Sequence, residues 1–438
     1  MMRHRILFVG EAVALGHVSR PAVLARWARE AGCEVHFACG TRYADVARSE
    51  GLDPIALETV EPRLFFSRLA RGRFFYRIEE LQRYVRAELE LIERIEPDLV
   101  VGDFRLTLPT SARLAGVRCL ALLNAHLSPA APRMLSAPEG GVFGLIPGRA
   151  REALFSAVEP LAFRYFAAPL DALRRSLGLE TFKDFREHYS SGDWCAYLDL
   201  PQLFAAGGGQ LAVDDESRPV TCSLPPTAHS PLPSGHFFLG PVIWQPRGLP
   251  EPDLGDLGLE RPLAYVSTGS SGSAKHLPRI LAAVLAAGFD VAASGGDEAV
   301  WAELRSALPA LAGRAFMARF FSPGRVLERA RVAICHGGSG TVYQALAAGV
   351  PVLCRPENQD QHMVTRTVVA AGGGMALELP RVGQQLAELA AGRCRLEAGR
   401  LSAAIRRHDT RRKWIGFLAS VSAAKAPERP LATEERRI

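Results

Sequence analysis

Short runs of consecutive apolar residues alternate with mixed polar and apolar stretches along most of the chain. Residues 5–10, apolar after Arg5, form the first run, residues 19–31 follow with helical spacing, and residues 34–38 (Glu-Val-His-Phe-Ala) are expected to form the next strand. An uninterrupted apolar run is typical of a strand that is buried on both faces of a sheet. Ser19 predicts the N-cap of the intervening helix and Pro21 its first turn. Together these segments predict a βαβ unit.

The same alternation recurs further along the chain, in two series. The first series continues with strands expected at 98–102 and 117–123; the second has strands at 263–267, 289–293, 332–335 and 350–354 and helices near 276–287, 297–312 and 340–348. Strands that alternate with helices in this way form parallel, doubly wound sheets. We therefore predict an α/β protein with two Rossmann-like doubly wound domains that face each other across a cleft.

Proline and glycine indicate where the two series are joined. Residues 241–262 contain five prolines together with several glycines and acidic residues, a composition typical of a linker. We expect an N-terminal domain at 1–240, the linker at 241–262 and a C-terminal domain at 263–400. A helix at 401–424 is expected to pack back on the N-terminal domain, and 425–438 forms a charged tail.

Length and composition exclude several classes of protein. The 438 residues correspond to about two or three domains, and 48% hydrophobic with 22% charged residues excludes wholesale disorder. The net charge of +6 is spread along the chain, which disfavours a dedicated nucleic-acid-binding protein. The eight cysteines include no Cys-x-x-Cys pair, so we expect neither a zinc site nor a disulfide framework. No signal-like or membrane-spanning apolar segment is apparent, which predicts a cytoplasmic protein.

A glycine-rich loop at 335–341 (Cys-His-Gly-Gly-Ser-Gly-Thr) follows a predicted buried strand and opens a predicted helix. Ligands bind at the carboxyl ends of strands in such sheets, and the free N–H groups of a helix N-terminus favour anions. His336 can add a hydrogen bond to a phosphate oxygen. The loop alone is also compatible with a tight strand-to-helix turn that binds nothing.

The residues after this loop extend it into a longer pattern. His336 is followed by Gly349-Val350-Pro351, Pro356 and Asp360-Gln361, and Phe321-Ser322-Pro323-Gly324 precedes it. This spacing resembles the donor signature of the GT-B UDP-glycosyltransferase superfamily, which includes the bacterial macrolide-type glycosyltransferases. Two positions depart from that signature: Gln344 stands where a glutamate usually binds the ribose hydroxyls, and Gly324 replaces a glutamine.

The resemblance implies a role for each matching residue. His336 and the backbone N–H groups of the loop would hold the diphosphate of a UDP- or dTDP-hexose, Ser270 would contact the phosphates from the other side, and Phe321 would stack on the base. Asp360 and Gln361 would bind hydroxyls of the donor sugar, although a capped helix N-terminus explains this pair equally well. No metal and no resident cofactor are expected. The implied donor-binding residues are Ser270, Phe321, His336, Gly338, Ser339, Gly340, Thr341, Gln344, Asp360 and Gln361.

His17 and Asp103 are the candidate catalytic residues of the first half. Sugar transfer to a hydroxyl needs a base, and a carboxylate on the other ring nitrogen orients an imidazole and stabilises its charged form. His17 lies after the first strand and Asp103 at the end of the strand 98–102, so both leave one sheet at the same edge. In the family that the chain resembles, residues at these two places form the catalytic dyad of an inverting transfer. Taken alone, His17 can equally be a capping or phosphate-binding histidine.

Residues 63–77 hold five arginines and five aromatic residues without any acid. Such a stretch can stack on nucleic-acid bases, lie on an anionic membrane or form an amphipathic helix pair with packed aromatics. Because the family places variable acceptor-binding segments here, we expect a small-molecule or lipid acceptor and peripheral contact with the inner face of a membrane, but no nucleic acid. Asn124 and His126, just after a strand, are weaker candidates for the acceptor pocket or for a turn.

The sequence therefore predicts an inverting glycosyltransferase that moves a hexose from a nucleotide sugar to an acceptor hydroxyl. Two alternatives share the fold: a nucleotide-sugar 2-epimerase, and a catalytically degenerate binding protein associated with a membrane.

Overall fold

The computed structural model describes residues 4–129, 131, 146–205, 234–249, 251–269, 272, 274–295 and 298–423. Its contacts divide the chain into two compact units. The first contains the described residues of 1–199, 230–242 and 410–438, and the second those of 200–229 and 243–409.

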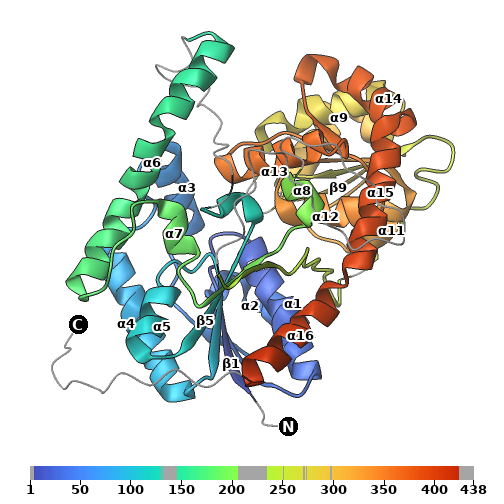
Figure 1. Cartoon of the computed structure of the whole chain (residues 1–438). Helices are drawn as coiled ribbons and strands as arrows, with labels where there is room; N and C mark the ends of the chain where they lie inside the picture. Colours follow the sequence, from blue (N-terminus) through green and yellow to red (C-terminus); the bar gives the residue numbers. More distant parts are fainter. Residues whose placement is uncertain are drawn as a thin grey trace, which may run out of the picture. The chain divides into compact units, whose positions relative to one another are not determined.

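The first unit is built on a seven-stranded sheet in the order β3-β2-β1-β4-β5-β6-β7, in which every strand pair is parallel. Its strands are β1 (Arg5–Gly10), β2 (Glu34–Cys39), β3 (Pro54–Ala56), β4 (Leu99–Asp103), β5 (Arg118–Leu123), β6 (Trp194–Tyr197) and β7 (His236–Phe238). Its helices are α1 (Gly16–Glu30), α2 (Ala44–Ser49), α3 (Pro62–Ala70), α4 (Ile78–Ile95), α5 (Leu108–Ala115), α6 (Gly148–Ser176), α7 (Phe185–Tyr189) and α16 (Thr410–Ala423). Helices α1 and α16 cover one face of the sheet, while α4 and α5 cover the other (Figure 1).

The second unit is built on a six-stranded sheet of parallel pairs in the order β10-β9-β8-β11-β12-β13. Its strands are β8 (Leu263–Ser267), β9 (Asp290–Ser294), β10 (Ala315–Ala318), β11 (Ala330–Cys335), β12 (Val352–Cys354) and β13 (Gly374–Ala376). Its helices are α8 (Pro201–Ala205), α9 (Leu277–Ala286), α10 (Glu298–Ala307), α11 (Gly324–Arg329), α12 (Ser339–Ala347), α13 (Gln359–Ala370), α14 (Val382–Ala391) and α15 (Arg393–His408).

Alternate residues of the central strand β8 enter two separate cores in this second unit. Leu263 and Tyr265 pack with residues of α12, α13 and α15, whereas Ala264 and Val266 pack with residues of α9, α10 and α14. Side chains of successive strand residues point to opposite faces, so an uninterrupted apolar run is what a sheet covered on both faces requires. The two Rossmann-like sheets predicted from the apolar runs are confirmed.

Helix α1 begins earlier than the sequence indicates. It runs from Gly16, so Ser19 and Pro21 lie inside the helix instead of at its N-cap and first turn. The predicted cap was therefore wrong. The helix begins directly after a compact turn in which the N–H groups of His17 and Val18 donate to the carbonyls of Ala14 and Leu15. This early start places His17 in the first turn of the helix.

By its contacts the chain leaves the first unit after Asp199 and again after Val242, and it returns to this unit at Thr410. Leu200 and Leu203 lie in the core of the second unit, and the N–H of Leu200 donates to the hydroxyl of Tyr343 at 3.0 Å. Of the expected 401–424 helix, residues up to 408 belong to α15 of the second unit. Asp409, in a left-handed conformation (φ 45°), separates α15 from α16. The anchor of α16 in the first unit is Trp414, which is fully buried.

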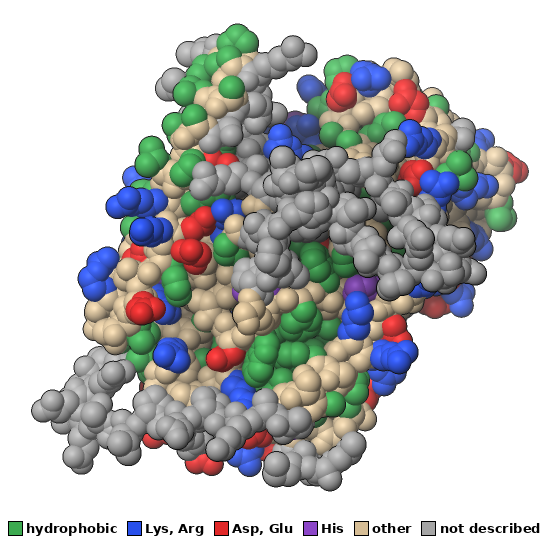
Figure 2. Space-filling view, viewed as in Figure 1, with side chains coloured by type: hydrophobic (Ala, Val, Ile, Leu, Met, Phe, Trp, Pro, Cys, Tyr) green, Lys and Arg blue, Asp and Glu red, His purple; other side chains and the backbone are tan. Residues whose placement is uncertain are grey.

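The arginines and lysines on the face shown in Figure 2 lie scattered among acidic and apolar side chains. Among the described residues, no helix is both long and apolar enough to cross a membrane.

Candidate active site and donor-binding site

His17 and Asp103 meet at the carboxyl edge of the first sheet, as predicted. Strands β1 and β4 are neighbours with Gly10 opposite Asp103, and His17 follows β1 by one turn. The Nδ1 atom of His17 lies 2.8 Å from Oδ1 of Asp103. Because an ionised carboxylate can only accept, Nδ1 carries the hydrogen of this bond, and in the neutral ring the lone pair is then on Nε2. The imidazole therefore has the tautomer that a general base needs.

Arg20, one turn further along α1, holds the same carboxylate. Its Nε lies 2.9 Å from Oδ2 of Asp103 and its Nη2 lies 2.8 Å from Oδ1, a bidentate pair. Asp103 is 1% exposed. Burial alone would raise the pKa of Asp103, but Arg20 and then His17 lower it below its ordinary value of 3.8. Asp103 is therefore ionised at neutral pH. Sequence reasoning missed Arg20, although its i+3 spacing from His17 on a helix places the two on one face.

Asn124 belongs to this polar network. Its Oδ1 accepts a hydrogen bond of 2.6 Å from Nη1 of Arg20, and the residue is 4% exposed. His126, in the 3-10 turn Ala125–Leu127, is also buried. Neither side chain offers much surface to an acceptor, so the structure gives the expected acceptor role of these two residues no support and assigns Asn124 to the support of Arg20.

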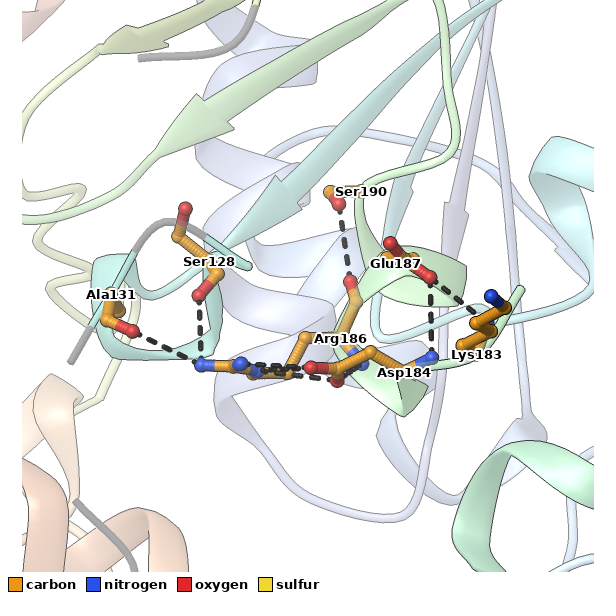
Figure 3. Close-up of polar contacts among 7 residues, drawn as sticks. All are labelled: Ser128, Ala131, Lys183, Asp184, Arg186, Glu187 and Ser190. Atoms are coloured by element: carbon orange, nitrogen blue, oxygen red, sulfur yellow. Dashed lines mark hydrogen bonds and ion pairs between the residues drawn. The ribbon is translucent and has the colours of Figure 1, made fainter. Parts of the chain in front are cut away.

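The segment that follows this turn is hydrogen-bonded to Arg186 of α7 (Figure 3). Nη1 of Arg186 donates to the carbonyls of Ser128 (3.4 Å) and Ala131 (3.1 Å), while its Nε and Nη2 bind both carboxylate oxygens of Asp184. Asp184 also caps α7 through the N–H of Arg186. Arg186 thus ties the end of this turn to a capped helix, which keeps the segment after β5 in place.

The ring of Phe104 lies against the imidazole of His17. Its ring stacks on the imidazole of His17, with centroids 4.6 Å apart and an interplanar angle of 23°. The same ring contacts Phe65, Phe75 and Tyr189 at centroid distances of 5.2–5.8 Å. The candidate base therefore lies at the edge of an aromatic cluster.

Four of the five aromatic residues in 63–77 are nearly buried, and they are Phe65, Phe74, Phe75 and Tyr76. Arg68 from the same stretch pairs with Glu80 at 2.6 Å. The segment comprises α3 and the turn before α4, so the structure favours the amphipathic helix pair, and these four rings are not available to stack on nucleic-acid bases. Arg63, Arg71 and Arg73 are exposed.

A second buried carboxylate, Glu11, lies directly after β1. Its Oε2 accepts from Nη1 of Arg105 at 2.9 Å, and Nε of Arg105 donates to Glu88 at 2.5 Å. Burial raises the pKa of Glu11 to about 7, against the opposing effect of Arg105. Within the described residues, Oε1 of Glu11 and the hydroxyl of Tyr76 have no hydrogen-bond partner.

His336, at the start of the glycine loop in the second unit, lies among three glycines. A side chain at Gly338 would place its Cβ 2.5 Å from Nε2, one at Gly272 would be 3.2 Å from Cβ of His336, and one at Gly269 would overlap the ring. Burial lowers the pKa of His336 from 6.5 to about 4, although Asp360 opposes this shift. The ring is thus neutral at pH 7 and offers a hydrogen bond instead of a charge. Its Nδ1 has no partner within the described residues.

The loop continues into α12, whose N-cap is Gly338 and whose first turn holds Ser339, Gly340 and Thr341 without an acidic side chain. The free N–H groups of this turn can bind an anion. Gln344 lies one turn further and donates to the carbonyl of Trp244 at 2.7 Å.

The remaining predicted donor residues are placed differently. Phe321 is 5% exposed and packs edge-on against Tyr265 and Phe316, so in this structure its ring belongs to the core and has little surface for a base. Gln361 is buried and its Oε1 accepts from the N–H of Glu357 at 2.8 Å. Asp360 is exposed in the first turn of α13. Ser270 lies outside the described residues.

Arg355, at the end of β12, is a further cation beside this loop. Its N–H donates to the carbonyl of Cys335 at 2.8 Å, and its Nη2 lies 2.9 Å from Nε2 of His276. It pairs with no carboxylate among the described residues, and its Nε is buried without a partner there. Sequence reasoning missed it because a single arginine after a strand carries no distinctive pattern.

The two units are parallel α/β sheets with candidate ligand-binding residues at their carboxyl edges, which is the architecture of the GT-B fold. A family model described as "Erythromycin biosynthesis protein CIII-like, C-terminal domain" matches residues 298–401. The chain is 35% identical over 381 residues to a PGL/p-HBAD biosynthesis glycosyltransferase of Mycobacterium tuberculosis, covering 87% of this chain and 82% of the relative. It is 36% identical over 384 residues to a PGL/p-HBAD biosynthesis rhamnosyltransferase of Mycobacterium bovis, covering 87% of this chain and 79% of the relative. The chain belongs to the GT-B UDP-glycosyltransferase superfamily.

Solved structures show the same fold at lower identity. The glycotransferase of kitacinnamycin has a TM-score of 0.68 at 17% identity, over 96% of this chain and 100% of that one. The spinosyn rhamnosyltransferase SpnG, complexed with thymidine diphosphate, has a TM-score of 0.62 at 18% identity, over 95% and 100%.

Proposed function

We propose that the protein is an inverting glycosyltransferase in which His17 is the general base. The observation that carries the proposal is the bond of 2.8 Å between Nδ1 of His17 and Asp103, which directs the lone pair of Nε2 away from the carboxylate. Nε2 takes the proton of an acceptor hydroxyl while the oxygen attacks the anomeric carbon of the donor sugar. The bond from that carbon to the diphosphate breaks, and the nucleoside diphosphate leaves with the electron pair. Asp103 stabilises the imidazolium that results.

The donor is a hexose linked to UDP or dTDP. The N–H groups at the start of α12 and the neutral ring of His336 would hold the diphosphate, and Arg355 would add a positive charge. These groups can stabilise the leaving group without a metal, and we propose that the reaction needs no resident cofactor. Gln344, in place of the usual glutamate, would bind the ribose through a hydrogen bond.

The acceptor is a hydroxyl on an apolar or aromatic small molecule or lipid. Its proposed binding surface starts at Phe104, because the half-buried ring of this residue stacks directly on His17. The two curated relatives take part in PGL/p-HBAD biosynthesis, and one is a rhamnosyltransferase, so a deoxyhexose donor is the first to assay. Peripheral contact with a membrane would rest on the exposed arginines of 63–77, and co-sedimentation with anionic vesicles tests it.

The decisive experiment is transfer by His17→Ala. We expect loss of sugar transfer with a dissociation constant for the nucleoside diphosphate close to that of the unchanged protein. His36→Ala is the matched control, since His36 pairs with Glu34 on β2, away from the carboxyl edge. Anomeric configuration is read from the NMR coupling of the product. Retained transfer by His17→Ala, or retained configuration at the anomeric carbon, contradicts the proposal; an epimerised nucleotide sugar without transfer favours the 2-epimerase.

A further inference from the structure

We propose that Arg20 is a positioning residue that supplies the counter-charge of Asp103 and thereby keeps His17 unprotonated between turnovers. The inference rests on the proposed function, because it concerns the same base. It adds a third member to the pair, one that has no place in the sequence pattern from which the pair was predicted.

A carboxylate as deeply buried as Asp103 requires a positive charge nearby, because an uncompensated buried charge is strongly destabilising. Two groups can provide that charge: Arg20, which is always protonated, and His17, which can gain a proton. If the charge came from His17, Nε2 would carry a proton in the resting enzyme and could not accept one from the acceptor. The charge of Arg20 removes this conflict.

The geometry shows that Arg20 is fixed in this role. Its side chain is 8% exposed, and its two bonds to Asp103 and its bond to Asn124 involve Nε, Nη1 and Nη2. The guanidinium is planar, so three anchored nitrogens determine its plane. Asn124 comes from the turn after β5, so the network joins α1, β4 and β5 at one edge of the sheet.

Arg20 also acts on His17 directly. Its Nη2 lies 3.3 Å from Nδ1 of the imidazole, whereas Oδ1 of Asp103 lies at 2.8 Å. The shorter distance favours the bond to the carboxylate, and the guanidinium then faces the ring as a like charge that opposes imidazolium. Among the described residues, Asp103 from β4 and Arg20 from α1 are the charged groups within ion-pair or hydrogen-bond distance of His17. The neighbouring ring of Phe104 is uncharged.

Asp103 and Arg20 therefore have different effects on His17. Asp103 selects the tautomer of His17, and Arg20 cancels the charge by which Asp103 would otherwise hold a proton on the ring. During the reaction the imidazole gains one proton from the acceptor hydroxyl, and the carboxylate then faces two cations until that proton leaves. Arg20 thus favours a resting base that is ready to accept.

The test compares Arg20→Gln with Arg20→Lys by ¹⁵N NMR of the imidazole and by the pH profile of kcat/KM. In Arg20→Gln we expect His17 to remain protonated to a pH at least one unit higher than in the unchanged protein, with the acid limb of the profile moving by the same amount. At a pH on the acid limb of both profiles the transfer rate then falls at least about tenfold, and it recovers at higher pH. Arg20→Lys keeps the charge but loses the bidentate geometry. The acid limb of its kcat/KM profile should therefore stay in place, while kcat falls.

Asn124→Asp provides a second route should Arg20→Gln fail to fold. It keeps Arg20 but offers it another carboxylate, so protonation of His17 should again extend to higher pH, while Asn124→Ala should leave it unchanged. An unchanged titration of His17 in both Arg20→Gln and Asn124→Asp overturns the inference. That result is distinct from failure of the proposed function, which is retained transfer in His17→Ala, because NMR reads the charge on His17 without reference to activity.

Discussion

Phe104 stacks on His17 with ring centroids 4.6 Å apart while its own backbone adopts a left-handed conformation (φ 58°). A non-glycine residue in that region costs about 1–2 kcal/mol. The strain is retained at the residue that follows Asp103, where the chain must turn sharply for the carboxylate and the adjacent ring to reach the same imidazole. Strained backbone of this kind concentrates at functional sites.

Two substitutions of Phe104 separate the strain from the stacking. Phe104→Ala loses the aromatic contacts and keeps the strain, whereas Phe104→Gly loses the same contacts and accepts the positive φ. We expect the glycine variant to be more stable than the alanine variant by about 0.5–1 kcal/mol in urea denaturation, the reverse of the order in helices and strands. Both should transfer sugar more slowly than the unchanged protein. Equal or inverted stabilities would mean that the turn relaxes when the ring is removed.

Asp103→Asn tests the tautomer of His17. The amide can present its N–H₂ group to Nδ1, which then carries no hydrogen, so the proton moves to Nε2 and the base is lost. We expect kcat to fall by about 10²–10⁴-fold, with nucleotide affinity unchanged in calorimetry. A structural control is Asp184→Asn, which weakens the anchoring of Arg186 without touching the dyad. A kcat within a few-fold of the unchanged protein would exclude Asp103 from this role.

The sheet framework and the pairing of His17 with Asp103 were predictable because each depends on local pattern and topology. The segments expected as strands at 5–10 and 263–267 have the same bounds as β1 and β8, and adjacent parallel strands bring His17 to Asp103 at one edge. Arg20 was not predicted, because its contact with Asp103 joins residues that are 83 positions apart in the sequence.

The positions of Phe321 and Gln361 in the structure show that a resemblance in sequence does not report how deeply a side chain is buried. Family spacing places each at a ligand-binding position, but it carries no information about burial. Phe321 packs between Tyr265 and Phe316, and Gln361 bonds the backbone at Glu357. The helix α1 was misjudged for a related reason: serine and proline mark a helix start statistically, whereas the turn at Ala14 and Leu15 sets it here.

Glu11 should make stability depend on pH. Its pKa is raised from 4.5 to about 7, chiefly by burial, with Arg105, Glu88 and Tyr76 around it. A raised pKa means that the folded protein binds the proton more tightly, so this contribution is complete below pH 4.5 and is lost as the pH rises through 7. Glu11→Gln removes the titration. Between pH 5 and pH 8 its unfolding free energy, relative to the unchanged protein, should improve by up to about 3 kcal/mol.

The control for this pH dependence is Glu58→Gln, which removes an exposed pair with Arg83. The difference in unfolding free energy between Glu58→Gln and the unchanged protein should vary little over the same pH range, because exposed pairs contribute about 0–1 kcal/mol. If the unfolding free energies of Glu11→Gln and the unchanged protein changed in parallel with pH, Glu11 would have to be ionised in the folded state at pH 5.

Removal of divalent metal should leave transfer intact. The proposed leaving-group stabilisation comes from N–H groups of α12, from His336 and from Arg355, none of which depends on a metal ion. We expect assays after extensive treatment with EDTA to retain the full rate. A loss of activity that added Mg²⁺ or Mn²⁺ restores would require a different account of how the diphosphate is stabilised.

Gly269→Ala tests whether the space around His336 serves the nucleotide. Gly269 has a positive φ of 60°, and a Cβ there would overlap the imidazole of His336. The ring must then move away from the start of α12, so we expect the affinity for a nucleoside diphosphate to fall at least about tenfold, or 1.4 kcal/mol. Gly248→Ala is the matched control: its φ of 76° imposes comparable backbone strain, but nothing lies within 4 Å of the added Cβ. Calorimetry on both variants, after circular dichroism has shown both to be folded, separates displacement of His336 from strain. Equal affinities would mean that the position of His336 does not determine diphosphate binding.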